Sequence, residues 1–328
     1  MTIKNFSERL SDGFIQPLSP LSIWLKFAII SLISVLISVK PTHPSWAVSM
    51  ILLAALILVP IGFQQLMRRS SDVNSRFKSV EPIYFTHLVS AFLLAISFIV
   101  KQGWVAGLLA LPYSIWCAFI GVKILKIDFK ITYLTTLAAW GFLTNAAIWC
   151  VFDRLDFQPW HFSPWIVLLT GAHFHYAGFA LTLSLALFLN ANPDDRVFKN
   201  CSRAILLGVV FTAVGITTTQ WGFTHVIETA ASVWMAIATF SVGLAVLLRG
   251  VHEVKRVKVL WILDGLCLML GMTLALGYAL RHFIFIEWLT MPNMQAVHGS
   301  LNALGFGTLM ILGWAFKPAY ALKDEVSE

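Results

Sequence analysis

The sequence carries few charged residues and few cysteines for its length. Charged side chains make up 12% of the 328 residues, whereas about a quarter is usual in a soluble domain. The four cysteines are isolated from one another, so they form neither a CxxC pair nor a disulfide framework. Walker A, Rossmann, HExxH and CxxCH motifs are also missing. Nothing therefore favours P-loop ATP hydrolysis, nicotinamide binding or covalent haem attachment.

Apolar residues dominate instead. They account for 58% of the chain, which includes 25 Phe and 13 Trp. A bilayer core about 30 Å thick needs about 20 apolar residues per helix. Stretches of that kind are predicted at 22–39, 46–66, 82–100, 103–123, 131–151, 163–190, 202–222, 225–248, 258–280 and 292–317. The sequence thus predicts a multi-pass protein of the cell membrane with about ten spans.

These stretches show no alternation of apolar and polar residues, which a membrane β-barrel would require. Backbone groups in lipid must be satisfied within the spanning segment, so helices are the remaining solution. We therefore expect an all-α transmembrane bundle over 22–317, with a short tail at 318–328. Residues 1–21 lack the apolar core of a signal peptide and are expected to form a tail or a short interfacial helix.

The basic residues predict the orientation. With ten spans, one set of loops and tails holds most of the Lys and Arg, including the groups at 68–78, 123–130, 196–203 and 249–258. The other set holds only Lys40, Lys101, Arg154 and Arg281. The positive-inside rule then places both termini in the cytoplasm. The same bias explains the net charge of +7 through anionic lipid headgroups, so nucleic acid is not an expected partner.

The sixth stretch carries the most informative polar residues. His173 and His175 lie within an apolar run, about 15 Å from the predicted outer end by helix rise. Ionisable groups at that depth are costly and are usually retained for a function. Their i, i+2 spacing places the rings about 200° apart on a regular helix, so one ion could not bind both. A π-bulge could bring them together, although no sequence feature predicts one.

Further polar residues fall in the same outer half. Glu228 lies near the start of the eighth stretch, and His298 and Asn302 share a face of the tenth. His173, His175, Glu228, His298 and Asn302 are the candidate catalytic residues, with Asn145, Tyr176, Gln220 and His225 in support. Packing is the competing explanation, since an intramembrane His or Asn more often forms an interhelical hydrogen bond. Asp264, in the ninth stretch, is either a buried proton carrier or a residue within reach of cytoplasmic water and of Arg256 or Lys258, and we favour the second interpretation.

The motifs carry a family resemblance. The string Leu169–Phe179, the triplet Ile227-Glu228-Thr229, Met291-Pro292-x-Met294 and the string His298-Gly299-x-x-Asn302-Ala303-x-Gly305-Phe306 resemble the YndJ-like family of bacterial membrane proteins. The similarity covers about residues 131–317, and the earlier spans show no such motif. The resemblance implies a polytopic membrane fold, but it implies no activity.

Three functions remain open. The first is an enzyme that uses His173 or His175, His298, Glu228 and Asn302 in acid/base chemistry on a lipid-like or isoprenoid substrate. It needs no cofactor; in a variant, His173 or His175, Glu228 and His298 bind Zn or Fe. The second is a solute or proton-coupled transporter. The third is a structural or partner-binding membrane protein. Membrane lipids are the expected surroundings in every case, and the sequence does not predict the oligomeric state.

Overall fold

The computed structural model describes residues 40–77, 79–125 and 128–318, and these ranges contain helices and no strands. Eight helices are long and apolar enough to cross a membrane, and the apolar helix α6 (Glu81–Ser97) is shorter. The predicted all-α bundle is therefore confirmed, although about ten spans are not reached within the described ranges. The predicted first span, at 22–39, and both tails except residue 318 lie outside them.

Three of the eight spans are interrupted by π-helical turns. The first is α3 (Pro44–Leu53), η1 (Ala54–Leu58) and α4 (Val59–Arg69), which the short α5 (Ser71–Asn74) follows. The second is α9 (Pro164–His173), η3 (Phe174–Ala180) and α10 (Leu181–Ala191). The third is α14 (Met291–Met294), η4 (Gln295–Gly299), η5 (Leu301–Gly307) and α15 (Thr308–Phe316).

The other five spans are uninterrupted: α7 (Trp104–Ile124), α8 (Ile131–Arg154), α11 (Arg196–Gln220), α12 (His225–Gly250) and α13 (Lys255–Ala279). A 3-10 turn, η2 (Pro159–His161), lies between α8 and α9.

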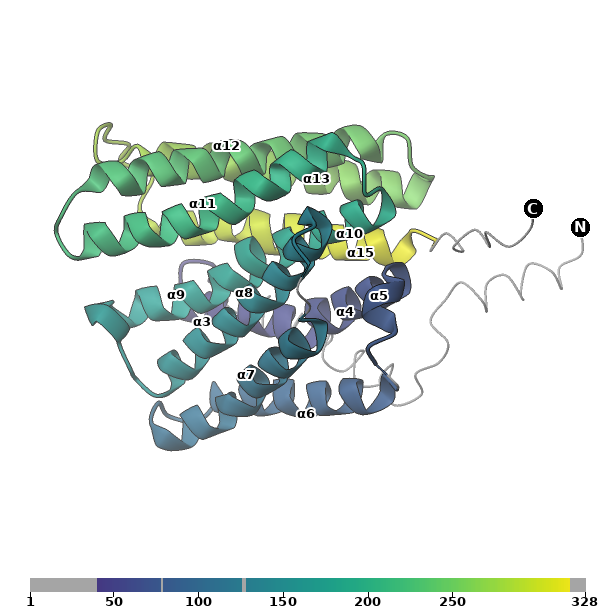
Figure 1. Ribbon diagram of the computed structural model, residues 1–328. Coiled ribbons are helices and arrows are strands. Elements are labelled where there is room, and N and C mark those ends of the chain that lie inside the picture. The colour runs from purple at the N-terminus through teal and green to yellow at the C-terminus, as the bar shows by residue number, and fades with distance from the viewer. Residues whose placement is uncertain (1–39, 78, 126–127, 319–328) are drawn as a thin grey trace, which may run out of the picture.

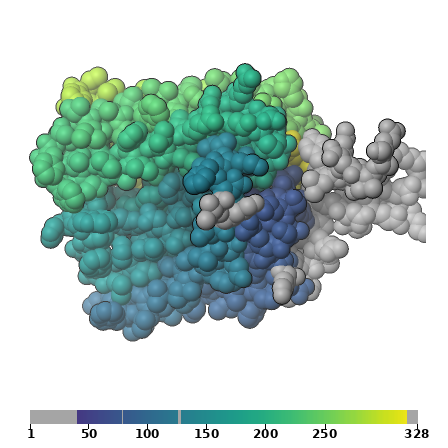
Figure 2. Space-filling model, viewed as in Figure 1, coloured from purple at the N-terminus to yellow at the C-terminus, as the bar shows by residue number. Residues whose placement is uncertain are grey.

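Successive helices pack into two groups. Helices α11, α12 and α13 form one layer, which runs along the upper side of the molecule in Figures 1 and 2. Helices α6, α7 and α8 pack in turn on the opposite side. The interrupted span Pro44–Arg69 lies between these groups and is the most enclosed, with 78% of its most apolar window buried.

Contacts between loops show that the helices alternate in direction. At one end, the Gly103 amide donates to the Arg154 carbonyl at 2.8 Å. The Gln295 side chain donates to the Pro41 carbonyl at 2.7 Å at this same predicted outer end. At the other end, Arg249 pairs with Asp195 and Lys317 with Glu253. That second end carries most of the basic residues, and its assignment to the cytoplasm stays a prediction.

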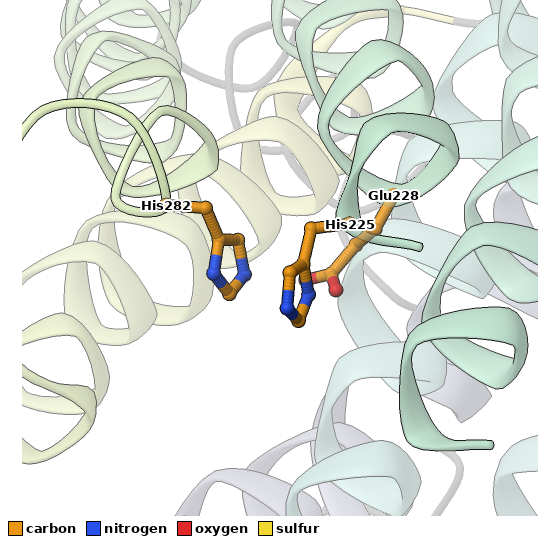
Figure 3. A group of neighbouring side chains, drawn as sticks. All are labelled: His225, Glu228 and His282. Atoms are coloured by element: carbon orange, nitrogen blue, oxygen red, sulfur yellow. The ribbon is translucent and has the colours of Figure 1, made fainter. Parts of the chain in front are cut away.

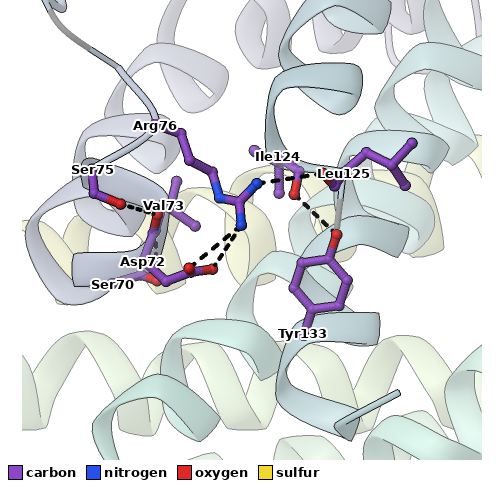
Figure 4. A network of polar contacts seen from close by, with 8 residues as sticks. All are labelled: Ser70, Asp72, Val73, Ser75, Arg76, Ile124, Leu125 and Tyr133. Carbon is purple, nitrogen blue, oxygen red and sulfur yellow. Dashed lines mark hydrogen bonds and ion pairs between the residues drawn. The ribbon is translucent and has the colours of Figure 1, made fainter. Parts of the chain in front are cut away.

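At the basic end, side chains bond to the carbonyls at the end of helix α7 (Figure 4). The Arg76 guanidinium lies 3.4 Å from the Leu125 carbonyl and from the Asp72 carboxylate. The Tyr133 hydroxyl donates to the Ile124 carbonyl at 2.9 Å. The last carbonyls of a helix have no partner within that helix. Residues of α8 and of the segment after α5 therefore hold the end of α7 in place.

Candidate functional site

Both histidine-containing strings lie on π-helical turns. The string around His175 includes η3, and the string around His298 includes η4 and η5. Segments η3 and η5 also pack against each other. A π-helical turn shifts side chains away from the regular helical register and occurs frequently at functional sites. The two strings therefore form one region of the bundle.

His175 is bonded on both ring nitrogens and is fully buried. Its Nδ1 lies 2.7 Å from the Gly171 carbonyl and must donate, since a carbonyl only accepts. The Nε2 atom is then the acceptor for the Tyr113 hydroxyl, 3.3 Å away on α7. The two rings are stacked with centroids 6.0 Å apart. These contacts are those of a side chain that joins helices.

His173 differs from its neighbour. Its side chain is exposed at the surface of the helix, and its ring has no hydrogen bond to any residue in the described ranges. It lies close enough to His298 for charges on the two rings to interact. The π-helical turn that follows His173 has not placed its ring beside that of His175. The two rings thus have different surroundings, and His173 is the one near the second string.

His298 and Asn302 form a pair on η4 and η5. Nδ1 of His298 donates to the Gly271 carbonyl of α13 at 2.8 Å, which fixes the tautomer and leaves Nε2 as the acceptor. The Asn302 amide nitrogen lies 3.1 Å from that Nε2 and donates to the His298 carbonyl at 2.9 Å. A Cβ atom added at Gly271 would lie 3.2 Å from the Asn302 amide nitrogen. Gly271 therefore permits the close approach of α13 to this pair.

Tyr176 and Trp46 join the two strings to the enclosed span. The Tyr176 hydroxyl donates to the Met50 carbonyl of α3 at 2.8 Å, and its ring lies against Gly307 of η5. The Trp46 indole donates to the Ser300 hydroxyl at 3.1 Å. His173, His298 and Asn302 are named here the mid-membrane cluster, and these bonds hold the segments that carry it.

Glu228 lies in a separate, outer cluster, together with His225, Arg281 and His282. Its Oε1 accepts from Arg281 at 2.5 Å. The Thr229 hydroxyl donates to the Ala279 carbonyl, which places this turn of α12 beside the end of α13. Gly271 precedes Ala279 by about two helical turns, about 12 Å. The structure therefore does not bring Glu228 together with His298, and no ligand set of His173 or His175, Glu228 and His298 assembles.

The remaining candidate residues lie outside the mid-membrane cluster or form no contact that defines a role. The Gln220 side chain donates to the His161 carbonyl at 3.3 Å, which joins the end of α11 to η2. Asn145 is half-buried on α8, without a hydrogen bond to any residue that the structure describes. His225 stacks on His282 with ring centroids 3.9 Å apart. His282 is the residue that the sequence interpretation missed, although it lies beside Arg281 in a loop at the same predicted outer end.

Asp264 corrects one expectation. Its side chain was expected to reach cytoplasmic water, but it is fully buried within α13. Both carboxylate oxygens lack a hydrogen-bond partner. The reason is packing: the neighbouring Gly265 lets α12 approach so closely that an added Cβ would lie 2.5 Å from the Gly243 carbonyl. This part of α13 is therefore closed to water.

Helical spans, apolar composition and buried intramembrane polar residues define a multi-pass membrane protein. Within that class, the YndJ-like protein family model matches residues 49–306, and the chain belongs to this family. The match begins well before residue 131, where the similarity predicted from the motifs begins. The chain is also 25% identical over 280 residues to "Uncharacterized membrane protein YndJ" of Bacillus subtilis (strain 168), a match that covers 84% of this chain and 50% of that protein. The chain thus spans about half the length of that curated relative. No solved structure matches the chain.

Proposed function

We propose that the mid-membrane cluster is an acid/base site that acts on a lipid-like or isoprenoid substrate in the cell membrane. The observation that carries the proposal is that η3 and η5, which belong to the two motif strings, pack against each other, with His173 near enough to His298 for their charges to interact. His173 has no hydrogen bond within the described ranges, so its nitrogens are available to exchange a proton. Imidazole is the side chain best suited to exchange protons near neutral pH.

The His298–Asn302 pair has the complementary role in this proposal. The bond from Nδ1 to Gly271 orients the ring and leaves Nε2 to accept a proton. Asn302 holds that nitrogen in position through its amide group. His175 is bonded on both nitrogens and, unlike the half-buried His298, is fully buried, so it serves as a positioning residue. The substrate is expected to be apolar because the cluster lies within spans that are themselves apolar.

The test compares lipids from a strain that lacks the protein with lipids from the same strain complemented by variants. Mass spectrometry of lipid extracts is expected to show a species that accumulates without the protein and returns to normal with the wild type. His173→Asn and His298→Asn should each leave that species elevated at normal protein abundance. His87→Asn is the matched control for His298→Asn, because His87 is an imidazole of the apolar helix α6 that bonds to the Ala55 carbonyl as His298 bonds to that of Gly271.

Full restoration of the lipid profile by both cluster variants would refute the enzyme proposal. Unchanged lipids together with an altered solute or proton flux would favour a transporter. If the profile is unchanged and no flux is altered, a structural or partner-binding role is the remaining interpretation.

A further inference from the structure

Three side chains with metal-binding atoms meet at the outer end of α12 (Figure 3). His225 is the first residue of α12, Glu228 lies in its first turn, and His282 lies in the loop after α13. One ligand atom from each lies within 4.8 Å of the other two. The two imidazole rings are nearly parallel, with an interplanar angle of 12°. This arrangement is independent of the mid-membrane cluster.

Local structure explains why the three residues converge. Thr224 caps α12 by accepting a hydrogen bond from the Val226 amide at 3.2 Å, which fixes where the helix begins. The i, i+3 spacing then puts His225 and Glu228 on one face. Thr229 bonds to the last turn of α13, and the Arg281 side chain bonds back to the Tyr278 carbonyl at 3.1 Å. These bonds bring the residue after Arg281 alongside the start of α12.

Both imidazoles and one of the two Glu228 oxygens form no hydrogen bond with the residues that the structure describes. Neither imidazole forms a hydrogen bond with any residue in the described parts of the chain. Glu228 bonds to Arg281 through Oε1, and its Oε2 has no such bond there. A carboxylate that is 7% exposed and bonded to an arginine is held in one orientation. Two imidazole nitrogens and one carboxylate oxygen are therefore held within 4.8 Å of one another.

We propose that His225, Glu228 and His282 bind one divalent transition-metal ion, with Zn²⁺ as the best match to two imidazoles and one carboxylate. Three protein ligands leave a fourth position for water. Bonds of about 2.0–2.1 Å in a tetrahedral site place ligand atoms about 3.3 Å apart, so the three ligand atoms must move closer together. The His282 ring must also rotate out of its stack on His225, so that both nitrogens point at the ion. His282 can supply that movement because it lies in a turn outside α13. Arg281 orients the carboxylate from outside the ligand set.

The ion would join the start of α12 to the loop that leads into α14. Exposed aromatic residues flank this region, namely Trp221, Phe223, Phe283, Phe285 and Trp288. Such residues are typical of the interface between lipid and water. The site would therefore be accessible from water at the predicted outer surface, without passage through the bundle.

The test uses the full-length protein, purified in detergent after treatment with a chelator. Titration with ZnCl₂ is followed by calorimetry, and binding of Co²⁺ by its visible absorption. The wild type is expected to bind one equivalent of Zn²⁺, with a Co²⁺ spectrum typical of four-coordinate nitrogen and oxygen ligation. His282→Asn and His225→Asn should weaken binding about 100-fold or more, and Arg281→Gln about 10-fold, as for an outer-shell partner.

His252→Asn is the matched control, because His252 is an exposed histidine in the loop at the other end of α12. It should bind Zn²⁺ like the wild type. The proposal is overturned if the wild type binds no stoichiometric Zn²⁺, or if both His225→Asn and His282→Asn keep wild-type affinity. Loss of binding in His252→Asn would likewise overturn it. Because His282 is an exposed loop residue, the His282→Asn variant is expected to fold and to elute as a single species in size-exclusion chromatography. Its Zn²⁺ affinity can then be compared directly with that of the wild type.

Discussion

The imidazole rings of the inner region and of the outer cluster differ in their hydrogen bonds. In the bundle interior, His298 donates to Gly271, and the adjoining His175 donates to Gly171, so each ring is tied to a backbone carbonyl. At the outer end, His225 and His282 contact each other through their ring faces and bond to no described residue. Water can satisfy the outer rings, whereas the surroundings of the inner rings cannot. An inner ring without such a bond, as in His173, is therefore the more significant observation.

The largest expected effect on stability comes from breaking the ion pair between Arg281 and Glu228 in the outer cluster. Arg281→Leu leaves the carboxylate of Glu228 buried and unpaired, and we expect it to destabilise the protein by about 3 kcal/mol. The measurement is the apparent Tm of the purified protein in detergent. The double variant Arg281→Leu/Glu228→Leu should recover part of this loss because no unpaired charge remains. Equal destabilisation by the single and double variants would contradict this account.

A smaller effect separates the two histidines of the first string. His175→Leu removes the bond to Gly171 and leaves the Tyr113 hydroxyl without its partner, which should cost about 1–2 kcal/mol. His173→Leu removes no such bond and should change the apparent Tm little. His173→Leu serves as the matched control for hydrophobic substitution on the same turn. Equal loss of stability in both variants would remove the distinction between the bonded and the available ring.

The smallest expected effect is a pH dependence at the outer cluster. Because the pKa of His282 is lowered in the folded state, the unfolded state binds more protons below about pH 6.5. Stability from this group is therefore present above the ordinary value of 6.5 and declines as the pH falls towards the lower folded value. Solvent screening keeps the effect small. His282→Gln should reduce the slope of apparent Tm against pH between pH 7 and pH 5, and an unchanged slope would argue against the shift.

Hydropathy predicted where the spans lie but not where every helix begins. The predicted stretch 225–248 matches α12 (His225–Gly250) closely, because Thr224 caps the helix where the apolar residues begin. The stretch 202–222 begins later than α11, which starts at Arg196. There, Asp195 accepts bonds from the Val197 and Phe198 amides and starts the helix in a polar segment. A cap depends on local hydrogen bonds, which an average over apolar residues does not detect.

The sequence identified most of the candidate residues, but it predicted less well which of them lie together. Depth along each span placed His173 and His298 at a similar level, and the two rings lie close enough for their charges to interact. The same criterion grouped Glu228 with them. Depth along a span does not give the distance between residues on different helices, so it did not separate Glu228 from this pair. His282 was missed since it follows a span, where a polar residue is usually just hydrated. The π-helical turns η3 and η5 pack against each other, and no local feature of the sequence predicted either turn.

The enclosed span Pro44–Arg69 has a consequence for biogenesis. It contacts residues from the far end of the described chain: Trp46 bonds to Ser300, and Arg69 donates to the Trp314 and Lys317 carbonyls at 2.9 and 2.6 Å. During synthesis, this helix enters the bilayer long before those partners emerge from the ribosome. Its inner surface must then remain in contact with lipid, an insertase or a chaperone until α15 arrives. Assembly of the bundle is therefore completed late, after translation has passed the second histidine string.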